Sequence, residues 1–234
     1  MQNAFLETLL QNWHKMGMQM NRRKNIRDDI LFDVARKADL NFTFLVFMGT
    51  SGILTTTALV TNSVPVLIGA MVIAPIMPPL QLVAFALVGG RWRLAMRGLG
   101  TAFLGLLVAV IFTFITGWLL DRLGIIEGFG NEIYKPLLEE RVRPGSYSLI
   151  VAIAAGFSGT LAIAEQKVDT LVGVVSAVAL VPAAGAGAIS VLAGDMGRAL
   201  GGFSLFAINF LLILGVAIIT LTLFGRFVEK KDAR

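Results

Sequence analysis

Residues Val64 to Gly90 read VPVLIGAMVIAPIMPPLQLVAFALVGG, an apolar stretch that is interrupted by Pro75, Pro78 and Pro79. About 20 apolar residues suffice for a helix to cross a bilayer. Each interior proline removes a backbone donor and clashes with the carbonyl four residues earlier, so the stretch predicts a broken transmembrane helix. Backbone groups freed at that depth cannot face lipid, so the break must be buried in protein or line a wet cavity. It is therefore the candidate functional site.

The charge distribution around this stretch predicts an all-α integral membrane protein. Of the 234 residues, 56% are hydrophobic, and no ionisable side chain occurs from residue 41 to residue 90, a run long enough for two spans. Four further uncharged runs cover residues 98–120, 144–164, 170–194 and 199–225. Each is long enough for one crossing, so we predict six transmembrane helices.

The residue types that catalysis inside a membrane requires are missing from the predicted spans. The chain has no cysteine, and its one histidine, His14, precedes the first span. A Ser–His pair, paired acids or a metal cluster cannot therefore form in the bilayer. No phosphate-binding glycine loop is present either. We predict a protein that is not an enzyme and that needs no cofactor and no metal.

Lysine and arginine are distributed unevenly among the polar segments. With the N-terminus inside, 15 of the 20 basic residues fall in cytoplasmic segments, which is the asymmetry that the positive-inside rule expects. We predict a multi-pass protein of the cytoplasmic (inner) membrane with both termini cytoplasmic. The basic residues flank membrane helices, so their expected partners are anionic lipid headgroups, and we do not expect nucleic acid binding.

Residues 1–40 form the long polar stretch before the first span. Two segments in it, Ala4 to Met20 and Arg27 to Ala38, place their apolar residues on one helical face. We predict two interfacial helices that pack under the bundle; alternatively, they form a gate or an oligomerisation arm. Residues 121–147 are predicted to be an extracytoplasmic linker with a short amphipathic helix after Pro136, and residues 228–234 to be a cytoplasmic tail.

Sliding the chain against itself by 107 positions reveals an internal repeat. Ser51 falls on Ser158, Pro75 falls on Pro182, and no gap is needed. The two units cover residues 41–120 and 148–227. Each unit contains three predicted spans, an odd number, so the second unit begins from the opposite side of the membrane. The sequence therefore predicts two inverted three-helix repeats.

Two proline-broken helices that meet across a pseudo-two-fold axis would aim their ends at one volume near the bilayer midplane. We predict a substrate-binding site there, lined by Ser51, Gly69, Pro75, Met77, Pro78 and Gln81 of the first unit and Ser158, Ser176, Pro182 and Gly185 of the second. Glu165 and Asn209 are candidates for ion or proton coupling, because a carboxylate in the bilayer needs a cation or a partner. Alternatively, Glu165 caps a helix at the interface, and the glycines and prolines only tighten helix packing.

The string LIGAMVIAPIMPPL, residues 67–80, together with the preceding apolar helix and its Ser-Gly pair, resembles the signature of a bacterial and archaeal membrane family known as domain of unknown function 389. The resemblance covers roughly residues 41–225. It implies a bundle of about six helices in the cytoplasmic membrane. It implies no substrate and no catalytic residues, because none is established for the family.

Two classes of function stay open. The first is a small secondary transporter or channel for a small solute or ion, because inverted units with matched helix breaks are typical of such proteins. The second is a membrane sensor or scaffold that acts through its cytoplasmic N-terminal tail. Glycine-rich faces, such as Gly98, Gly100 and Gly105, could pack between subunits, so we also predict a homo-oligomer.

Overall fold

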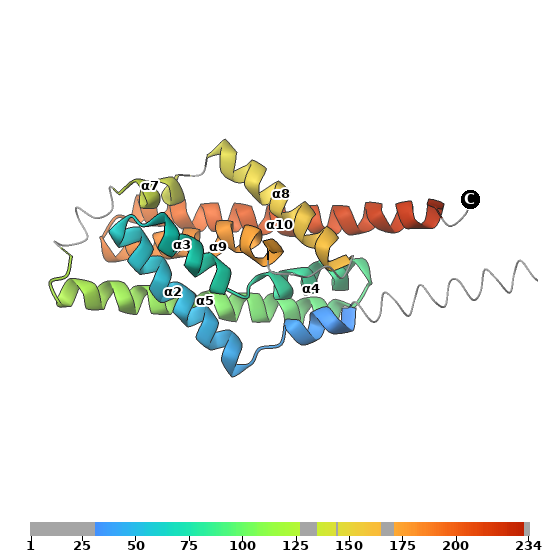
Figure 1. Cartoon of the computed structure of the whole chain (residues 1–234), viewed down its shortest axis with the longest axis horizontal. Helices are drawn as coiled ribbons and strands as arrows, with labels where there is room; N and C mark the ends of the chain where they lie inside the picture. The colour runs from blue at the N-terminus through green and yellow to red at the C-terminus, as the bar shows by residue number, and fades with distance from the viewer. Residues whose placement is uncertain (1–30, 127–134, 144, 165–170, 232–234) are drawn as a thin grey trace, which may run out of the picture.

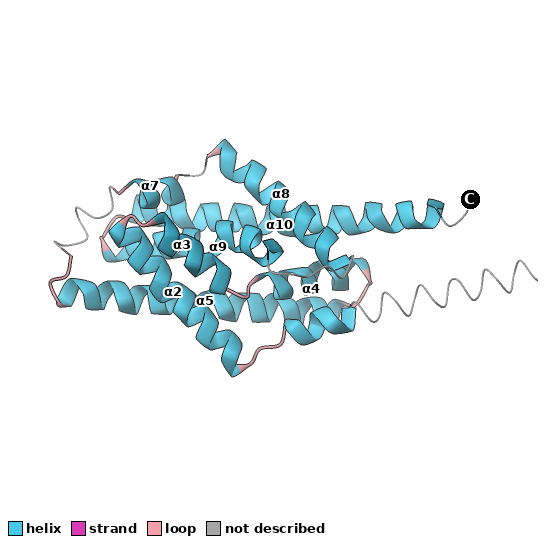
Figure 2. Ribbon diagram, viewed as in Figure 1, coloured by secondary structure: helices cyan, strands magenta, loops and turns pink. Residues whose placement is uncertain are grey.

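The computed structural model of the chain describes residues 31–126, 135–143, 145–164 and 171–231, and no strand occurs in these ranges (Figures 1 and 2). A short helical segment of residues 31–37, here called helix 31–37, comes first. The helices that follow are α2 (Phe42–Thr61), α3 (Val64–Ile73), α4 (Met77–Val88), α5 (Trp92–Arg122), α7 (Pro136–Val142), α8 (Ser146–Ala164), α9 (Leu171–Leu192) and α10 (Met196–Lys231). The predicted all-α class is confirmed.

Three stretches are each long and apolar enough to cross a membrane: Phe42–Thr61, Trp92–Arg122 and Met196–Leu223. Two bent pairs also pass this test, α3 with α4 at an angle of 48°, and α7 with α8. The described residues therefore contain three to five candidate spans. In α9, the apolar segment found by this test is Leu180–Leu192, which is shorter than a bilayer crossing. The six predicted crossings therefore stay a prediction.

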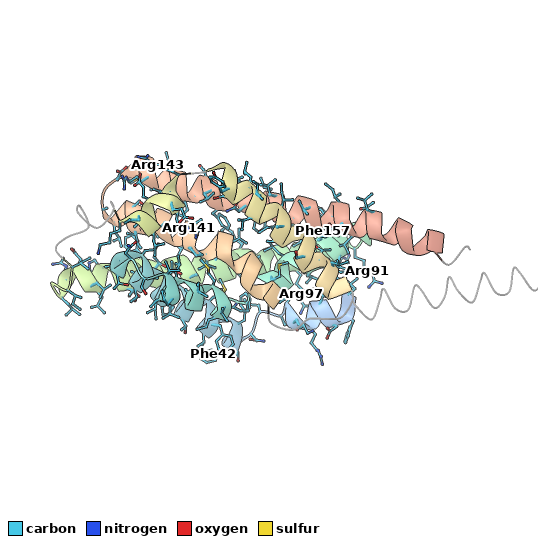
Figure 3. All side chains as sticks on the ribbon, turned by 45° about the horizontal axis from the view of Figure 1, so that its top comes forward. Phe42, Arg91, Arg97, Arg141, Arg143 and Phe157 are labelled. Carbon is cyan, nitrogen blue, oxygen red and sulfur yellow. The ribbon has the colours of Figure 1, made fainter. Side chains whose placement is uncertain are left out.

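Charged side chains lie at the two ends of the bundle. Figure 3 shows Arg141 and Arg143 toward one end and Arg91 and Arg97 toward the other. Between these ends, α5 carries no ionisable residue from 98 to 120, which is about 35 Å of helix. Large apolar side chains such as Phe103 are exposed along it. This arrangement suits a bundle surrounded by lipid.

The limits of α2 follow from local sequence. The backbone N–H of Phe44 donates to the side-chain oxygen of Asn41 at 2.8 Å, which caps the start of the helix. Asn62 ends the helix in the left-handed region, with φ of 55°. Pro65 then lies in the first turn of α3, where a missing N–H costs nothing. A helical hairpin between α2 and α3 results.

The short helix predicted after Pro136 is confirmed as α7. Its Leu138 and Val142 side chains are buried. The backbone N–H of Leu137 donates to Asn62 at 3.1 Å, and Glu139 pairs with Arg198 at 2.8 Å. Helix α7 is thereby fixed to the α2–α3 turn on one side and to α10 on the other.

Helix 31–37 packs on the outside of α4 and α5. Its buried face is made by Leu31 and Val34, which join Ala38 in a cluster with Leu82, Val83 and Ala86 of α4 and Ala95 of α5. The predicted one-sided face of residues 27–38 is confirmed over residues 31–38. The predicted helix from Ala4 to Met20 lies outside the described residues.

The two longest helices, α5 and α10, run in opposite directions along the molecule, and α2 and α8 also point in opposite directions (Figure 1). Helix boundaries in the two halves match at a shift of 104 positions. The matched residues are the first of α2 and α8 (Phe42 and Ser146), the first of α5 and α10 (Trp92 and Met196), and the last of α4 and α9 (Val88 and Leu192).

Four close helix crossings, two in each half, follow the same shift of 104 positions. A Cβ atom at Gly52 would collide with the carbonyl oxygen of Ala109, and one at Gly156 would lie 2.9 Å from that of Ile213. The matched crossings on the other side are Gly98 with the Pro79 carbonyl, at 2.8 Å, and Gly202 with the Ala183 carbonyl, at 2.9 Å. Both halves therefore require glycine at the same two crossings, because helices approach this closely only without a side chain.

Burial along α5 and α10 also matches. Six buried positions of α5, Ala95, Gly98, Thr101, Gly105, Ala109 and Thr113, correspond to buried Ala199, Gly202, Leu205, Asn209, Ile213 and Ala217 of α10. The shift predicted from the sequence, 107, is three residues longer than the shift that the boundaries support. Three residues are nearly one helical turn, so the two shifts match similar helix faces one turn apart. The structural shift pairs Pro182 with Pro78 instead of Pro75.

Candidate functional site at the interrupted helix

The predicted break separates α3 from α4 at residues 74–76. Pro75 has no N–H to give to the Met71 carbonyl, and the N–H of Ile76 turns back to the Ala74 carbonyl at 2.9 Å. The carbonyls of residues 71 and 72 therefore lose their usual helical donors. Just before the break, the Ser51 hydroxyl of α2 donates to the Ala70 carbonyl at 2.7 Å. Ser51, a predicted site residue, thus supports the end of α3.

The break is buried in protein. Ala74 and Ile76 are 4% and 0% exposed, and both belong to the main apolar cluster together with Leu180 and Val181 of α9. Helices α3 and α9 are in contact. A break at this depth was expected either to be buried in protein or to line a wet cavity, and in this structure it is buried in protein.

Pro182 does not break its helix, and this corrects the prediction of two proline-broken helices. Helix α9 continues from Leu171 to Leu192 with Pro182 inside it. The physical reason is the number of donors lost. A single proline removes one hydrogen bond, whereas Pro75, Pro78 and Pro79 remove three within five residues. Helix α9 is therefore not interrupted at Pro182, whereas the α3–α4 stretch is interrupted at Pro75.

Gln81 forms a buried polar contact between the two halves. Its side chain is 0% exposed on α4, and its Nε2 donates to the hydroxyl oxygen of Thr160 on α8 at 3.2 Å. The Thr160 hydroxyl donates in turn to the Gly156 carbonyl at 2.7 Å. Met77 is the other neighbour, with its sulfur 3.8 Å from the Gln81 nitrogen. Two predicted residues, Gln81 and Met77, are thus brought together.

A second buried polar cluster joins α2 and α5, and Gly185 of α9 packs against it. The Thr56 hydroxyl donates to the carbonyls of Gly52 and Thr113 within 3.1 Å, and the Thr113 hydroxyl also donates to the Gly52 carbonyl. Thr55 is 0% exposed, and its methyl group lies 2.5 Å from where a Cβ atom of Gly185 would be. Glycine at 185 therefore makes room for Thr55.

The two polar clusters correspond under the shift of 104 positions. Gln81 falls on Gly185, and Thr56 falls on Thr160. One cluster joins α4 of the first half to α8 of the second; the other joins α9 of the second half to α2 of the first. Each threonine hydroxyl bonds the carbonyl four residues earlier, of Gly52 or Gly156. The halves thus meet through two related contacts of different chemistry.

The remaining predicted residues are placed as follows. Gly69 is half-buried with free space where a side chain would begin, Pro75 and Pro78 are half-buried, and Pro182 is buried. Ser158 is exposed on α8, so it does not join the buried clusters. Asn209 is 1% exposed on α10. Glu165 and the Ser176 side chain lie outside the described residues.

Sequence reasoning missed Thr160 and Thr113. The threonine run at 55–57 was visible, but a threonine can always bond its own helix, so its meaning depends on what packs opposite. Thr56 and Thr160 each follow a glycine by four positions, and this shared pattern in the sequence could have indicated both clusters.

No group of His, Cys, Asp or Glu within the described residues could hold a metal ion. The chemistry available at the two clusters is therefore hydrogen bonding by an amide, by hydroxyl groups and by backbone carbonyls.

These features define an all-α membrane protein that is built around a proline-interrupted helix with buried polar contacts. The model of a family described as domain of unknown function (DUF389) matches residues 71–215, and the chain belongs to this family. The chain is also similar to an uncharacterized protein of Methanocaldococcus jannaschii, MJ0678, at 25% identity over 210 residues. The match covers 88% of this chain and 62% of that relative, so the chain spans less than two thirds of the relative's length. No solved structure matches the chain.

Proposed function

We propose that the protein is a small secondary transporter or channel for a small solute or ion, built from two inverted three-helix repeats. The observation that carries the proposal is the pair of buried contacts between the halves: the hydrogen bond of Gln81 with Thr160, and the packing of the Thr55 methyl group against Gly185. Gln81 and Gly185 correspond at the shift of 104 positions. Helices α5 and α10 run in opposite directions, as inverted repeats require (Figure 1). Binding sites of such proteins lie at the interface of the repeats.

The chemistry of the break favours a cation or a neutral polar solute. The C-terminal end of α3 carries partial negative charge, and Pro75 leaves the Met71 carbonyl without its helical donor. The start of α4, where an anion would need backbone N–H groups, carries Pro78 and Pro79. Two of the usual donors are therefore missing at that helix start.

The packed state of the break favours a moving mechanism over an open pore. Ala74, Ile76 and Leu80 are all at most 4% exposed. A solute could pass only if the halves shift relative to each other. The contact of Gly185 on α9 with Thr55 on α2 is a crossing between the halves at which one helix presents no side chain. We propose alternating exposure of the break to the two sides of the membrane.

Flux through reconstituted vesicles tests the proposal. Purified protein in liposomes is tested with potassium, sodium, protons and neutral amino acids, with dyes or radiolabel as readout. We expect one of these to move, and Gln81→Leu to lower the flux at least tenfold, because the buried amide is removed. Ser158→Ala is the matched control, since Ser158 is exposed on α8, and it should retain the flux. Silence of the wild type across the panel, or equal loss in both variants, would count against transport.

A sensor or scaffold is the second candidate. It is favoured by helix 31–37, which packs Leu31 and Val34 against α4, the helix that carries Gln81. A conformational change at the break between α3 and α4 could thereby be transmitted to the residues that precede helix 31–37. Deletion of residues 1–30 separates the candidates: a transporter keeps its flux, whereas a scaffold loses its cellular effect although the membrane part still folds.

We further propose that the protein crosses the cytoplasmic membrane six times with both termini inside, and that it forms a homo-oligomer. The exposed apolar side chains of α5 and α8, including Phe103, Ile115 and Ile150, would face lipid or a second subunit. Cross-linking in native membranes and accessibility of single introduced cysteines, one near each terminus, check these two statements.

A further inference from the structure

Two short amphipathic helices lie at opposite ends of the bundle, α7 at one end and helix 31–37 at the other (Figure 1). They correspond at the shift of 104 positions that relates the two halves. Val34 falls on Leu138 and Ala38 falls on Val142, and these four side chains are all at most 4% exposed. Each half of the bundle is therefore preceded by a short helix that packs its apolar side at one end.

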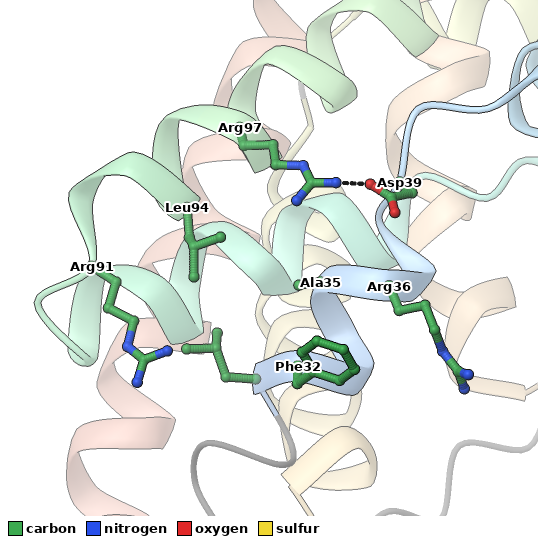
Figure 4. A pocket seen from close by; sticks show the side chains of 8 residues that line it. Phe32, Ala35, Arg36, Asp39, Arg91, Leu94 and Arg97 are labelled. Atoms are coloured by element: carbon green, nitrogen blue, oxygen red, sulfur yellow. Dashed lines mark hydrogen bonds and ion pairs between the residues drawn. The ribbon is translucent and has the colours of Figure 1, made fainter.

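Both short helices are docked onto their long helix at the same place. Asp39, which follows helix 31–37, pairs with Arg97 near the start of α5, the dashed line in Figure 4. At the other end, the carbonyl oxygen of Val142 in α7 lies where a Cβ atom of Gly201 in α10 would collide with it. Gly201 is the residue that corresponds to Arg97 at the shift of 104. An ion pair holds one short helix, and a close backbone contact holds the other.

Helix α7 is held by both halves of the bundle. The backbone N–H of Leu137 donates to the side-chain oxygen of Asn62 at the α2–α3 turn, at 3.1 Å. The Glu139 carboxylate pairs with Arg198 of α10 at 2.8 Å. The buried side chains of α7 belong to the same apolar cluster as the break between α3 and α4. Helix α7 thus covers one end of the packed interior that contains the break, and a few polar contacts keep it there.

We propose that α7 is a lid that closes one end of the path to the break, and that helix 31–37 is its counterpart at the other end. The gating role rests on the proposed transport, in which the break is exposed alternately to the two sides. In the proposed topology, the α7 end faces the outside of the cell. Opening of the lid requires the contacts of Leu137 with Asn62 and of Glu139 with Arg198 to separate.

A buried hydroxyl group marks the path beneath the lid. Thr55 is 0% exposed, and its hydroxyl oxygen has no hydrogen-bond partner among the residues that the structure describes. It lies seven residues, about 10 Å of helix, before Asn62 at the lid, and four residues, about 6 Å, after Ser51, which bonds the Ala70 carbonyl close to the break. A buried hydroxyl without a partner costs free energy, and this cost disappears in a state in which water reaches Thr55.

Single introduced cysteines can report the opening directly, because the chain has no cysteine of its own. Thr55→Cys places a thiol on the path beneath α7. Leu82→Cys places a thiol at a position that is also 0% exposed, but in the cluster under helix 31–37. The full chain in lipid nanodiscs, which leave both faces accessible, is treated with a charged maleimide, and the modification rate of each cysteine is measured by mass spectrometry.

Two perturbations of the lid are combined with each cysteine, and each has a matched control. Gly201→Ala displaces α7 by the collision with the Val142 carbonyl, whereas a Cβ atom at Gly197, also on α10, meets a side-chain atom at an ordinary distance of 3.4 Å. Gly197→Ala is therefore its control.

The second perturbation, Glu139→Gln, removes the ion pair with Arg198 but keeps the size of the side chain. Glu140→Gln is its control, because it removes the same charge from a neighbouring carboxylate that is 64% exposed and lies 3.8 Å from Arg141. Thermal unfolding establishes which variants are folded at the temperature of the experiment. If Gly201→Ala does not fold, Glu139→Gln decides the test.

We expect both perturbations to accelerate modification of Thr55→Cys by about tenfold or more, because a hydrogen bond to a charged group typically accounts for such a factor in an opening equilibrium. The modification rate follows the population of the open form when the lid opens and closes fast. The rate at Leu82→Cys should stay unchanged, and both controls should leave both rates unchanged. An unchanged rate at Thr55→Cys in the folded perturbed variants overturns the proposal. Equal acceleration in the controls, or at Leu82→Cys, also overturns it, because the bundle would then loosen as a whole.

The outcome for the lid is separate from the outcome for transport, because the modification rates do not measure flux. Faster modification at Thr55→Cys in a protein that moves no solute of the panel would support the lid and count against transport. Flux through a protein whose Thr55→Cys rate does not respond to Glu139→Gln would support transport and count against the lid.

Discussion

The contact between Gln81 and Thr160 gives the sharpest test of how the two halves are joined. Thr160→Val keeps the side-chain volume but removes the hydroxyl that accepts from Gln81 at 3.2 Å. Polar contacts between membrane helices average about 0.6 kcal/mol and reach about 1.7 kcal/mol. Because both side chains are 0% exposed, we expect a coupling of about 1 kcal/mol between Gln81→Leu and Thr160→Val in a double-mutant cycle.

The assay is reversible unfolding in mixed micelles of the wild type, the two single variants and the double variant. Thr101→Val is the matched control, because the buried Thr101 hydroxyl also bonds its own helix, at the Arg97 carbonyl. Thr101→Val removes a hydrogen bond from a threonine hydroxyl to its own helix, as Thr160→Val does. The additional loss of unfolding free energy in Thr160→Val therefore measures the contact with Gln81. A coupling below about 0.3 kcal/mol, the usual error of additivity, would refute the contact between α4 and α8.

Two further predictions concern packing and pH. Gly98→Ala should destabilise the fold by about 1–3 kcal/mol, because its Cβ would lie 2.8 Å from the Pro79 carbonyl oxygen. Gly69→Ala meets nothing within 4 Å, so it should be neutral or stabilise the fold by up to about 1 kcal/mol. Thermal unfolding of both variants checks this difference. Hydrogen bonding to Lys37, together with the charges of Lys37 and Arg36, lowers the pKa of Asp33 from 3.8 despite the opposing effect of desolvation. The stabilisation from Asp33 is therefore present above pH 3.8 and is lost as the pH falls through the lowered value. Unfolding measured from pH 5 downward should show this loss in the wild type and not in Asp33→Asn, and identical profiles would contradict it.

The sequence by itself determined the membrane class, the helical content and the position of the break. These follow from local causes: uncharged runs longer than a bilayer crossing, and three prolines whose missing donors no partner can restore. The short helix after Pro136 and the apolar face of residues 31–38 were predictable for the same reason, because the spacing of apolar side chains along one helix is a property of that helix.

Only the tertiary structure decided what faces what. The match of helix boundaries at a shift of 104 positions, the intact helix around Pro182 and the exposure of Ser158 depend on which turn of a helix meets which neighbour. Thr160 became part of the candidate site only because Gln81 lies opposite it, 79 positions earlier in the chain. Helical periodicity fixes a face to within about one turn, and the choice between neighbouring turns is made by close packing between helices that are distant in sequence.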